Sequence, residues 1–409
     1  MKKFAALLGI FMLSACSASE PETAPKQIIA ETVAATESAQ IVETEPAPDT
    51  VVARTRNLLF MQVDLFQNGA DPSPDYALAE MLALMGREDL ITSPENEGVS
   101  QCPRRWVDPV DSITQSSSNA RVVVLVEHPH RSRQRAFIND VASALIDEGF
   151  SYYASDGFDL SNPPLNLPEF AKLNEGLFVR EPIFGRLVRN LKSRDVNFLS
   201  LDLLMSPPVN QTPETLARHE ASRRIMQADR LALTIMESDP ESRIIVHLID
   251  PDDVETVSYS NAVDFPISQF AERLREKTGV TPLMLGQTKC RAAWTGSVML
   301  PKLGRGGRSV NKYGIVVAHP IDTLRDGRPE WRRARGDKDV TVPNQFLTHS
   351  QPVIIEARRA DDPEISVPED RLLLLPGDNL PLLLPAGSYR IEGWTKNGPI
   401  AGPVEVLVE

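Results

Sequence analysis

Between residues 121 and 285 the chain alternates continuous apolar runs with stretches whose apolar residues recur at helical spacing. Residues 121–126 are a β-branched run of the kind found in a strand that is buried on both faces. Phe137, Val141 and Leu145 follow at four-residue spacing and therefore share one face of a helix, which Gly149 is expected to end. This first unit is a strand followed by a helix.

The same alternation recurs along the chain. It predicts further strands at 150–154, 196–203, 243–249 and 281–285, and helices at 183–191, 214–238 and 267–277. Strands that alternate with helices indicate an α/β fold, with a mostly parallel sheet flanked by helices on both faces. In such sheets a ligand site forms beyond the carboxyl ends of the strands.

The pattern changes after Trp294, where helical periodicity stops and short apolar runs are separated by Gly and Pro. These runs predict strands at 313–318, 352–357, 371–375 and 388–394, with turns at 385–387 and 396–398. We therefore expect a small antiparallel β domain, arranged like a sandwich, over residues 295–409.

The amino terminus has the pattern of a secretory signal. Lys2 and Lys3 precede an apolar run at 4–13 that is too short to anchor the chain across a bilayer. Leu13-Ser14-Ala15-Cys16 then resembles the lipobox of bacterial lipoproteins, which implies a signal peptide at 1–15 and diacylglyceryl transfer to the Cys16 thiol. The expected partner of Cys16 is a lipid bilayer. Ser17, in place of Asp, favours the outer membrane facing the periplasm.

Residues 16–55 are rich in Ala, Glu, Thr and Pro and contain no aromatic residue. Such a segment buries too little apolar surface to offset the entropy of ordering it, so we expect a disordered acidic tether. The α/β domain is then expected to occupy residues 56–294. The net charge of −13 argues against a nucleic-acid partner, because phosphate binding needs concentrated Lys and Arg.

Two further features are a pair of cysteines and a short basic run. Cys102 and Cys290 either form one disulfide in an oxidising compartment or remain two separate thiols. The basic run Arg332-Arg333-Ala334-Arg335 is expected to be solvated surface.

Residues able to carry acid–base chemistry stand at the predicted strand ends. Glu127 and His130 follow the first strand, Asp156 follows the second, and His247 lies within the strand at 243–249. If they converge, they are candidates for general acid–base catalysis or metal binding. The structural alternative is an ion pair of Glu127 with Arg224 or Arg131, a solvent-facing His128, and a hydrogen-bonded core histidine at 247.

From about residue 105 to its end, the chain resembles the erythromycin-esterase/ChaN-like superfamily. The matching motifs are Glu127 with His130 and Arg135-Ala136-Phe137, Asp156, Arg224 with Gln227-Ala228, Val246-His247, Thr278-Gly279-Val280-Thr281-Pro282, Gln287-Thr288, and Asp326-Gly327-Arg328-Pro329-Glu330-Trp331. The resemblance implies an esterase-type hydrolase using Glu127, His130 and Asp156. By analogy with the ChaN branch, it alternatively implies a haem- or iron-binding lipoprotein.

Two departures from the family pattern weaken both activities. Asp252 stands where the family has a histidine after Val246-His247, and Pro129 replaces another in the first turn. A carboxylate does not replace an imidazole as a base near pH 7 unless its pKa is strongly raised. No zinc-type ligand spacing, Gly-x-Ser-x-Gly motif or haem motif is present, so neither a metal nor another cofactor is predicted.

The favoured hypothesis is a membrane-anchored module with a degenerate site, which binds a small molecule or a partner in the cell envelope. Its candidate ligand-binding residues are Arg224, His247 and Asp252.

Overall fold

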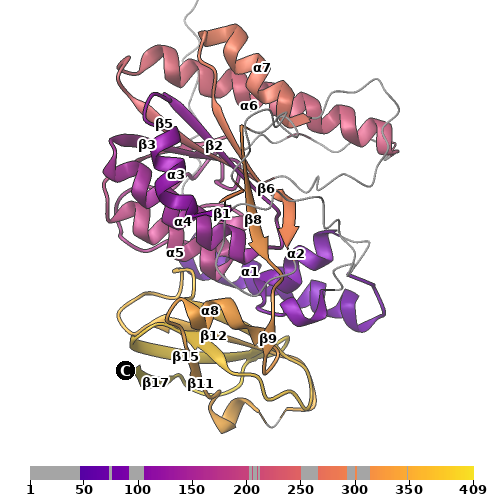
Figure 1. The fold of residues 1–409 in the computed structure, drawn as a ribbon. Coiled ribbons are helices and arrows are strands. Elements are labelled where there is room, and N and C mark those ends of the chain that lie inside the picture. The colour runs from indigo at the N-terminus through magenta and orange to yellow at the C-terminus, as the bar shows by residue number, and fades with distance from the viewer. Residues whose placement is uncertain are drawn as a thin grey trace, which may run out of the picture. The chain divides into compact units, whose positions relative to one another are not determined.

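The computed structural model describes residues 47–72, 76–91, 106–201, 205, 210, 212–249, 266–292, 300–301, 314–347 and 349–409. Cys16, most of the predicted tether, Cys102 and Asp252 lie outside these residues, so the predictions made for them stay predictions. The fold is α/β, with a parallel sheet flanked by helices and a smaller antiparallel β region after it (Figure 1).

The parallel sheet has six strands in the order β4-β3-β5-β2-β6-β8. In chain order they are β2 (Val122–Glu127), β3 (Phe150–Ser155), β4 (Asn197–Ser200), β5 (Arg243–Ile249), β6 (Leu283–Ala292) and β8 (Ile315–Pro320). Strand β2 is buried along its whole length and pairs with β5 and β6, which is why its sequence is apolar at every position before Glu127. The two central strands, β5 and β2, carry two of the predicted site residues.

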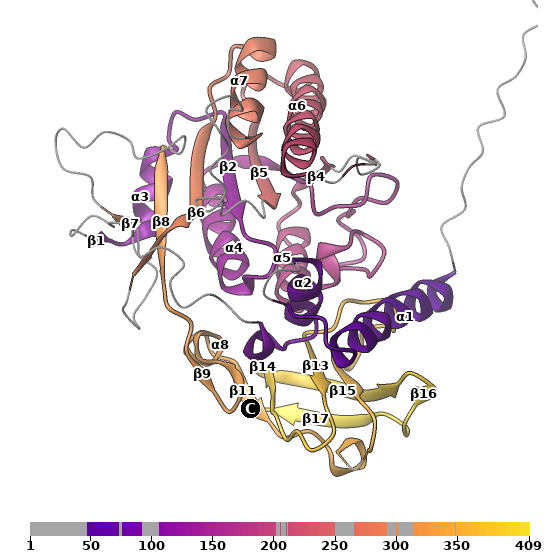
Figure 2. The same cartoon turned by 90° about the vertical axis from the view of Figure 1, so that its right-hand side faces the viewer.

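Helices cover both faces of the sheet (Figure 2). One face packs against α3 (Pro109–Ser116), α4 (Ser132–Asp147) and α5 (Pro182–Lys192), and the other against α6 (Pro213–Glu237) and α7 (Pro266–Thr278). Gly149 has φ +92°, which confirms the predicted glycine at the end of α4. None of the described helices is long and apolar enough to cross a membrane.

The antiparallel region contains a five-stranded sheet. Strands β13 (Asp370–Leu374), β12 (Val353–Arg359) and β15 (Gly387–Thr395) pair in that order, and β16 (Gly398–Pro399) and β17 (Val404–Val408) both pair with β15. Along β15 the residues alternate between buried and partly exposed, as expected of a strand with one face on a core.

The remaining short elements surround these two sheets. They are η1 (Glu88–Leu90), β1 (Trp106–Val107), η2 (Phe178–Arg180), β7 (Leu300–Pro301), β9 (Leu324–Arg325), β10 (Arg328–Pro329), α8 (Glu330–Ala334), β11 (Lys338–Val340), η3 (Asn344–Phe346) and β14 (Leu382–Leu384). Strands β11 and β14 form a separate two-stranded ladder.

Three elements, β8, α1 (Pro48–Gln67) and α2 (Tyr76–Leu84), lie differently from the predicted organisation of the chain. The strand predicted at 313–318 is β8, which pairs parallel with β6 and belongs to the α/β sheet, so the β region does not begin at 295. Helix α1 begins inside the segment predicted as tether. Its second half, together with α2, packs with Ile354 and Leu373 of the antiparallel sheet, and Val51 and Val52 in its first half belong to the core cluster of the parallel sheet. Sequence pattern gives an element's type but not its partner, which only long-range packing decides. Pro46–Glu409 therefore cluster as one compact unit.

Candidate functional site

Glu127 ends β2 as a fully buried carboxylate, and Arg135 on α4 neutralises it. Nε and Nη2 of Arg135 lie 2.7 and 2.6 Å from the same Glu127 oxygen. The predicted partner was Arg224 or Arg131, and the residue that the structure pairs with this carboxylate is Arg135. Arg135 is eight residues away and one helical turn into α4, which places its guanidinium back over the strand end. Burial alone would raise the pKa of Glu127, but Arg135 and His247 together outweigh burial and lower it.

Arg135 also joins Glu127 to the start of α5. Its Nη1 donates to Glu181 at 3.0 Å, and its Nη2 donates to the Pro129 carbonyl at 2.9 Å. Glu181 in turn caps α5, since its side chain accepts a hydrogen bond from the Phe184 backbone N–H at 2.7 Å. One guanidinium thus fixes the strand end, the turn after it and a neighbouring helix.

His247 of β5 completes a buried chain of polar groups. Its Nε2 lies 3.3 Å from the second oxygen of Glu127, and its Nδ1 lies 2.9 Å from the Tyr153 hydroxyl. Burial, then the Glu127 charge, raises the pKa of Tyr153 well above its usual value, so the phenol stays protonated. A phenol that donates to Nδ1 leaves the ring proton on Nε2, facing the carboxylate. The chain of polar groups Tyr153–His247–Glu127–Arg135 is then closed at both ends, by a protonated phenol at one and by a guanidinium at the other.

This chain is sealed from solvent. Glu127, His247 and Tyr153 are each 0% exposed, and the Phe184 ring stacks on the His247 ring with centroids 5.2 Å apart. His247 is therefore a hydrogen-bonded core histidine, the structural alternative that its apolar strand indicated. Neither nitrogen of its ring faces an open space where a substrate proton could be exchanged.

Asp156 and Arg224 form a second buried pair, after β3. Arg224 Nη1 donates to Asp156 Oδ2 at 2.7 Å, and the Ile249 backbone N–H donates to Oδ1 at 2.9 Å. Arg224 also donates to the Ile249 carbonyl at 2.7 Å, which ties α6 to the end of β5. Arg224 is 0% exposed, so it serves this pair and does not line an open site.

The two histidines after β2, His128 and His130, lie against each other. His128, expected to face solvent, is 2% exposed, and its ring meets the His130 ring edge-on with centroids 4.1 Å apart. Burial, with the charges of Arg131 and Arg135, lowers the pKa of His130 to about 3. His130 would thus donate no proton near neutral pH. The three residues of the predicted hydrolase centre contact different groups. Glu127 contacts Arg135 and His247, His130 contacts the His128 ring, and Asp156 contacts Arg224.

Sequence reasoning missed a further polar layer beside β2. His319, at the end of β8, lies with Nε2 2.8 Å from Gln287 Oε1 on β6, and Gln287 donates to the Val126 carbonyl at 3.2 Å. Burial lowers the pKa of His319 to about 3. Because residues 313–318 were assigned to the β region, His319 was not placed at this edge of the sheet. Pairing of β8 with β6 was the missing information.

An open cavity of about 270 Å³ lies beside Asp156, just beyond the carboxyl end of β3. Its lining residues come from the loop after β3, from the segment before α5 that includes η2, and from α6. They are Asp156, Gly157, Phe158, Asp159, Asn174, Gly176, Leu177, Phe178, Arg180 and Arg223. The two loops touch at Gly176, where φ is +154° and a Cβ would lie 2.0 Å from the Gly157 carbonyl oxygen. Only glycine at 176 allows this approach.

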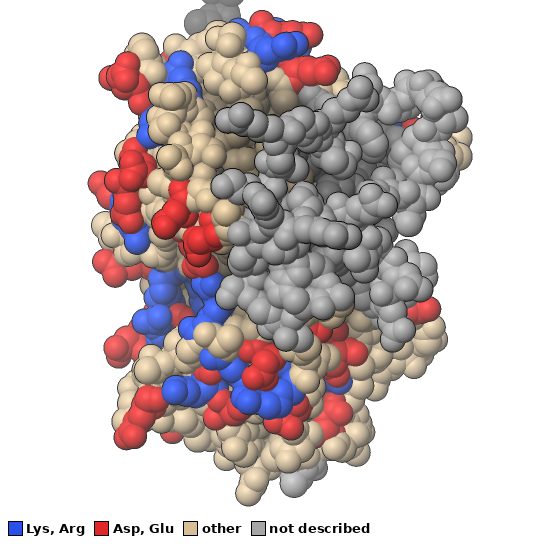
Figure 3. Space-filling model, in the orientation of Figure 1, with Lys and Arg blue, Asp and Glu red and all other residues tan. Residues whose placement is uncertain are grey.

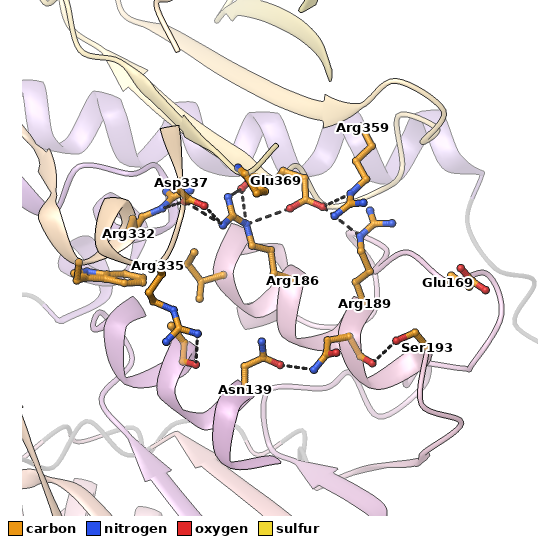
Figure 4. A pocket seen from close by; sticks show the side chains of 15 residues that line it. Asn139, Glu169, Arg186, Arg189, Ser193, Arg332, Arg335, Asp337, Arg359 and Glu369 are labelled. Carbon is orange, nitrogen blue, oxygen red and sulfur yellow. Dashed lines mark hydrogen bonds and ion pairs between the residues drawn. The ribbon is translucent and has the colours of Figure 1, made fainter. Parts of the chain in front are cut away.

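A larger cavity, of about 520 Å³, lies between α4, α5 and the β region (Figure 4). Its arginines have protein partners. Arg186 donates to both oxygens of Asp337, and Arg332 pairs with Asp337 at 2.8 Å and with Asp370 at 2.6 Å. The run at 332–335 is therefore not plain solvated surface, since Arg332 is only 3% exposed. These pairs hold the β region on α5, and we assign this cavity a structural role.

On the face drawn in Figure 3, basic side chains gather over the lower half of the described surface with acidic ones among them.

In the part of the chain that the structure describes, no group of three or more His, Cys, Asp or Glu side chains is placed to hold a metal ion.

Comparisons with known proteins do not show a family for this chain. No family model matches the chain, and no curated protein matches it. The solved structure of the type III effector HopBA1 is similar at 13% sequence identity, over 56% of this chain and 100% of that one. Its TM-score of 0.32 is too low to support a statement about fold or function.

Proposed function

We propose that this protein is a lipid-anchored binding module of the bacterial cell envelope, and that the edge of its sheet has no hydrolytic activity. The observation that supports this best is the closed chain Tyr153–His247–Glu127–Arg135. A hydrolase needs a base or nucleophile with a free lone pair next to its substrate. Here the Glu127 oxygens face Arg135 and His247, and all of these groups are buried.

The anchoring half of the proposal rests on the lipobox-like sequence ending at Cys16. The binding half rests on the 270 Å³ cavity, which opens where ligands bind in parallel sheets. The resemblance to the erythromycin-esterase/ChaN-like superfamily is compatible with both halves if the site is degenerate.

The hydrolytic question is tested with the purified chain lacking residues 1–16 and a simple ester, p-nitrophenyl acetate, as probe. We expect the chain to hydrolyse this ester no faster than its own Glu127→Gln variant does at the same concentration. Turnover that disappears in both Glu127→Gln and His247→Gln, with folding retained by circular dichroism, would overturn the proposal in favour of the esterase. A haem Soret band that shifts on adding the protein would favour the haem alternative instead.

A further inference from the structure

Two opposite charges face the 270 Å³ cavity without forming an ion pair with each other. Arg180, at the end of η2, and Asp159, in the loop after β3, both line it. They are close enough for the Asp159 charge to act on the Arg180 guanidinium. Both residues are described, yet no nitrogen of Arg180 lies within 4.0 Å of an Asp159 oxygen. The cavity is therefore lined by two opposite charges that are not paired with each other.

Arg180 retains donors for a ligand. Its Nε donates to the Leu173 carbonyl at 2.8 Å, which orients the guanidinium. Among the described residues, its two terminal nitrogens have no hydrogen-bond partner. Burial and the nearby charge of Arg371 lower the pKa of Arg180, so the cation lies in a site where an added anion would stabilise it.

Asp159 has one oxygen engaged and one remaining. Oδ1 accepts the backbone N–H groups of Ser161 and Asn162, at 2.8 and 3.1 Å, which fixes the carboxylate in a tight turn. Within the described chain, Oδ2 has no hydrogen-bond partner. A cationic group of a ligand would find this oxygen already oriented.

The other charges of the cavity cancel one another. Arg223 donates to both oxygens of Glu220 and lies 3.3 Å from Asp156, whose carboxylate is also held by Arg224. Arg180 and Asp159 therefore decide which charges the cavity accepts. A dianion such as phosphate would be repelled by Asp159, and a plain cation by Arg180.

We propose that this cavity binds a small zwitterion of the amino-acid type, with its carboxylate on Arg180 and its ammonium on Asp159. This inference rests on the proposed binding function and names its ligand class. A guanidinium binds a carboxylate through two parallel hydrogen bonds, and the volume suits a ligand of a few non-hydrogen atoms and not a polymer.

The test is calorimetric titration of the chain lacking residues 1–16 with alanine as the zwitterion, and with acetate and methylammonium as probes that each carry one charge. We expect alanine to bind at least about tenfold more tightly than either single-charge probe, since each charged hydrogen-bonding partner typically contributes that factor. Arg180→Gln and Asp159→Asn should each weaken alanine binding by about tenfold or more. Asn at 159 retains the oxygen that the turn requires, and Arg180→Lys, which keeps the charge but loses the two parallel donors, should bind alanine more tightly than Arg180→Gln does.

Matched controls are Arg194→Gln and Asp147→Asn, which remove an ion pair between the end of α4 and the segment after α5, outside the cavity lining. They should leave alanine binding unchanged. Acetate binding that equals alanine binding and is indifferent to Asp159→Asn would overturn the zwitterion in favour of a simple anion site. No heat with any probe at millimolar concentration would overturn the ligand class alone. The proposed function is overturned by separate results, such as Glu127-dependent hydrolysis or a haem Soret shift, which these titrations do not measure.

Discussion

Arg135 places two nitrogens on a single oxygen of Glu127, at 2.7 and 2.6 Å, with both side chains at most 1% exposed. This contact turns a carboxylate that sequence pattern marks as catalytic into a structural anion.

Removal of one partner of this pair should be costly. Arg135→Met leaves Glu127 and Glu181 buried without their counter-charge, and we expect a loss of about 3 to 5 kcal/mol in the free energy of unfolding, measured by urea titration. Glu127→Gln combined with Arg135→Met should recover part of that loss. Arg218→Met, in an exposed pair with Glu214, is the control and should change stability by less than about 0.5 kcal/mol.

Tyr153→Phe should test the row of buried polar groups at the end opposite Arg135. The variant removes the hydroxyl that satisfies His247 Nδ1 at 2.9 Å, which leaves a buried ring nitrogen without that partner. We expect a cost of about 1 to 3 kcal/mol in chemical unfolding. The neighbouring Tyr152→Phe, at a partly buried ring on the opposite face of β3, should cost clearly less. Equal costs for the two variants would argue against the hydrogen bond.

Glu80 on α2 should make stability depend on pH in an unusual direction. Burial raises its pKa to about 7, although Arg135 acts against this. Because the folded state binds the proton more tightly than the unfolded chain, this contribution is fully present below about pH 4.5 and is lost as pH rises through 7. Glu80→Gln should therefore be more stable than the wild type at pH 8, by about 1 to 3 kcal/mol.

The difference between Glu80→Gln and the wild type should shrink steadily between pH 8 and pH 5. Thermal unfolding at matched ionic strength measures it, and taking the difference cancels the other carboxylates, several of which have lowered pKa values. A difference that stays constant over this range would show that Glu80 keeps an ordinary pKa.

Cys16→Ser should release the protein from the membrane. The predicted diacylglyceryl group would then have no thiol to attach to, and the protein would lose the proposed anchor, whose acyl chains each contribute about 0.8 kcal/mol per buried CH₂. Fractionation of cells followed by immunoblotting should find the variant in the soluble fraction and the wild type in the membrane fraction. Ser17→Ala is the control and should stay membrane-bound. A Cys16→Ser protein that stays with the membrane would contradict lipid anchoring.

The sequence by itself determined the elements of the parallel sheet. Residues 121–126 and 243–249 were predicted as strands, and α4, α5, α6 and α7 as helices, because hydrophobic period and glycine or proline at the ends are local signals. It also indicated the edge where Glu127, Asp156 and His247 would lie, since the carboxyl ends of parallel strands share one edge.

Only the tertiary structure decided which residues meet there. Arg135 and not Arg224 neutralises Glu127, His319 joins the edge through β8, and the second half of α1 packs on the antiparallel sheet. Each of these facts depends on contacts between residues far apart in the chain or on the direction of a side chain over a turn. The same holds for the opposite charges of Arg180 and Asp159, which line one cavity without pairing with each other. No local pattern records that two loops enclose a cavity and leave two charges apart.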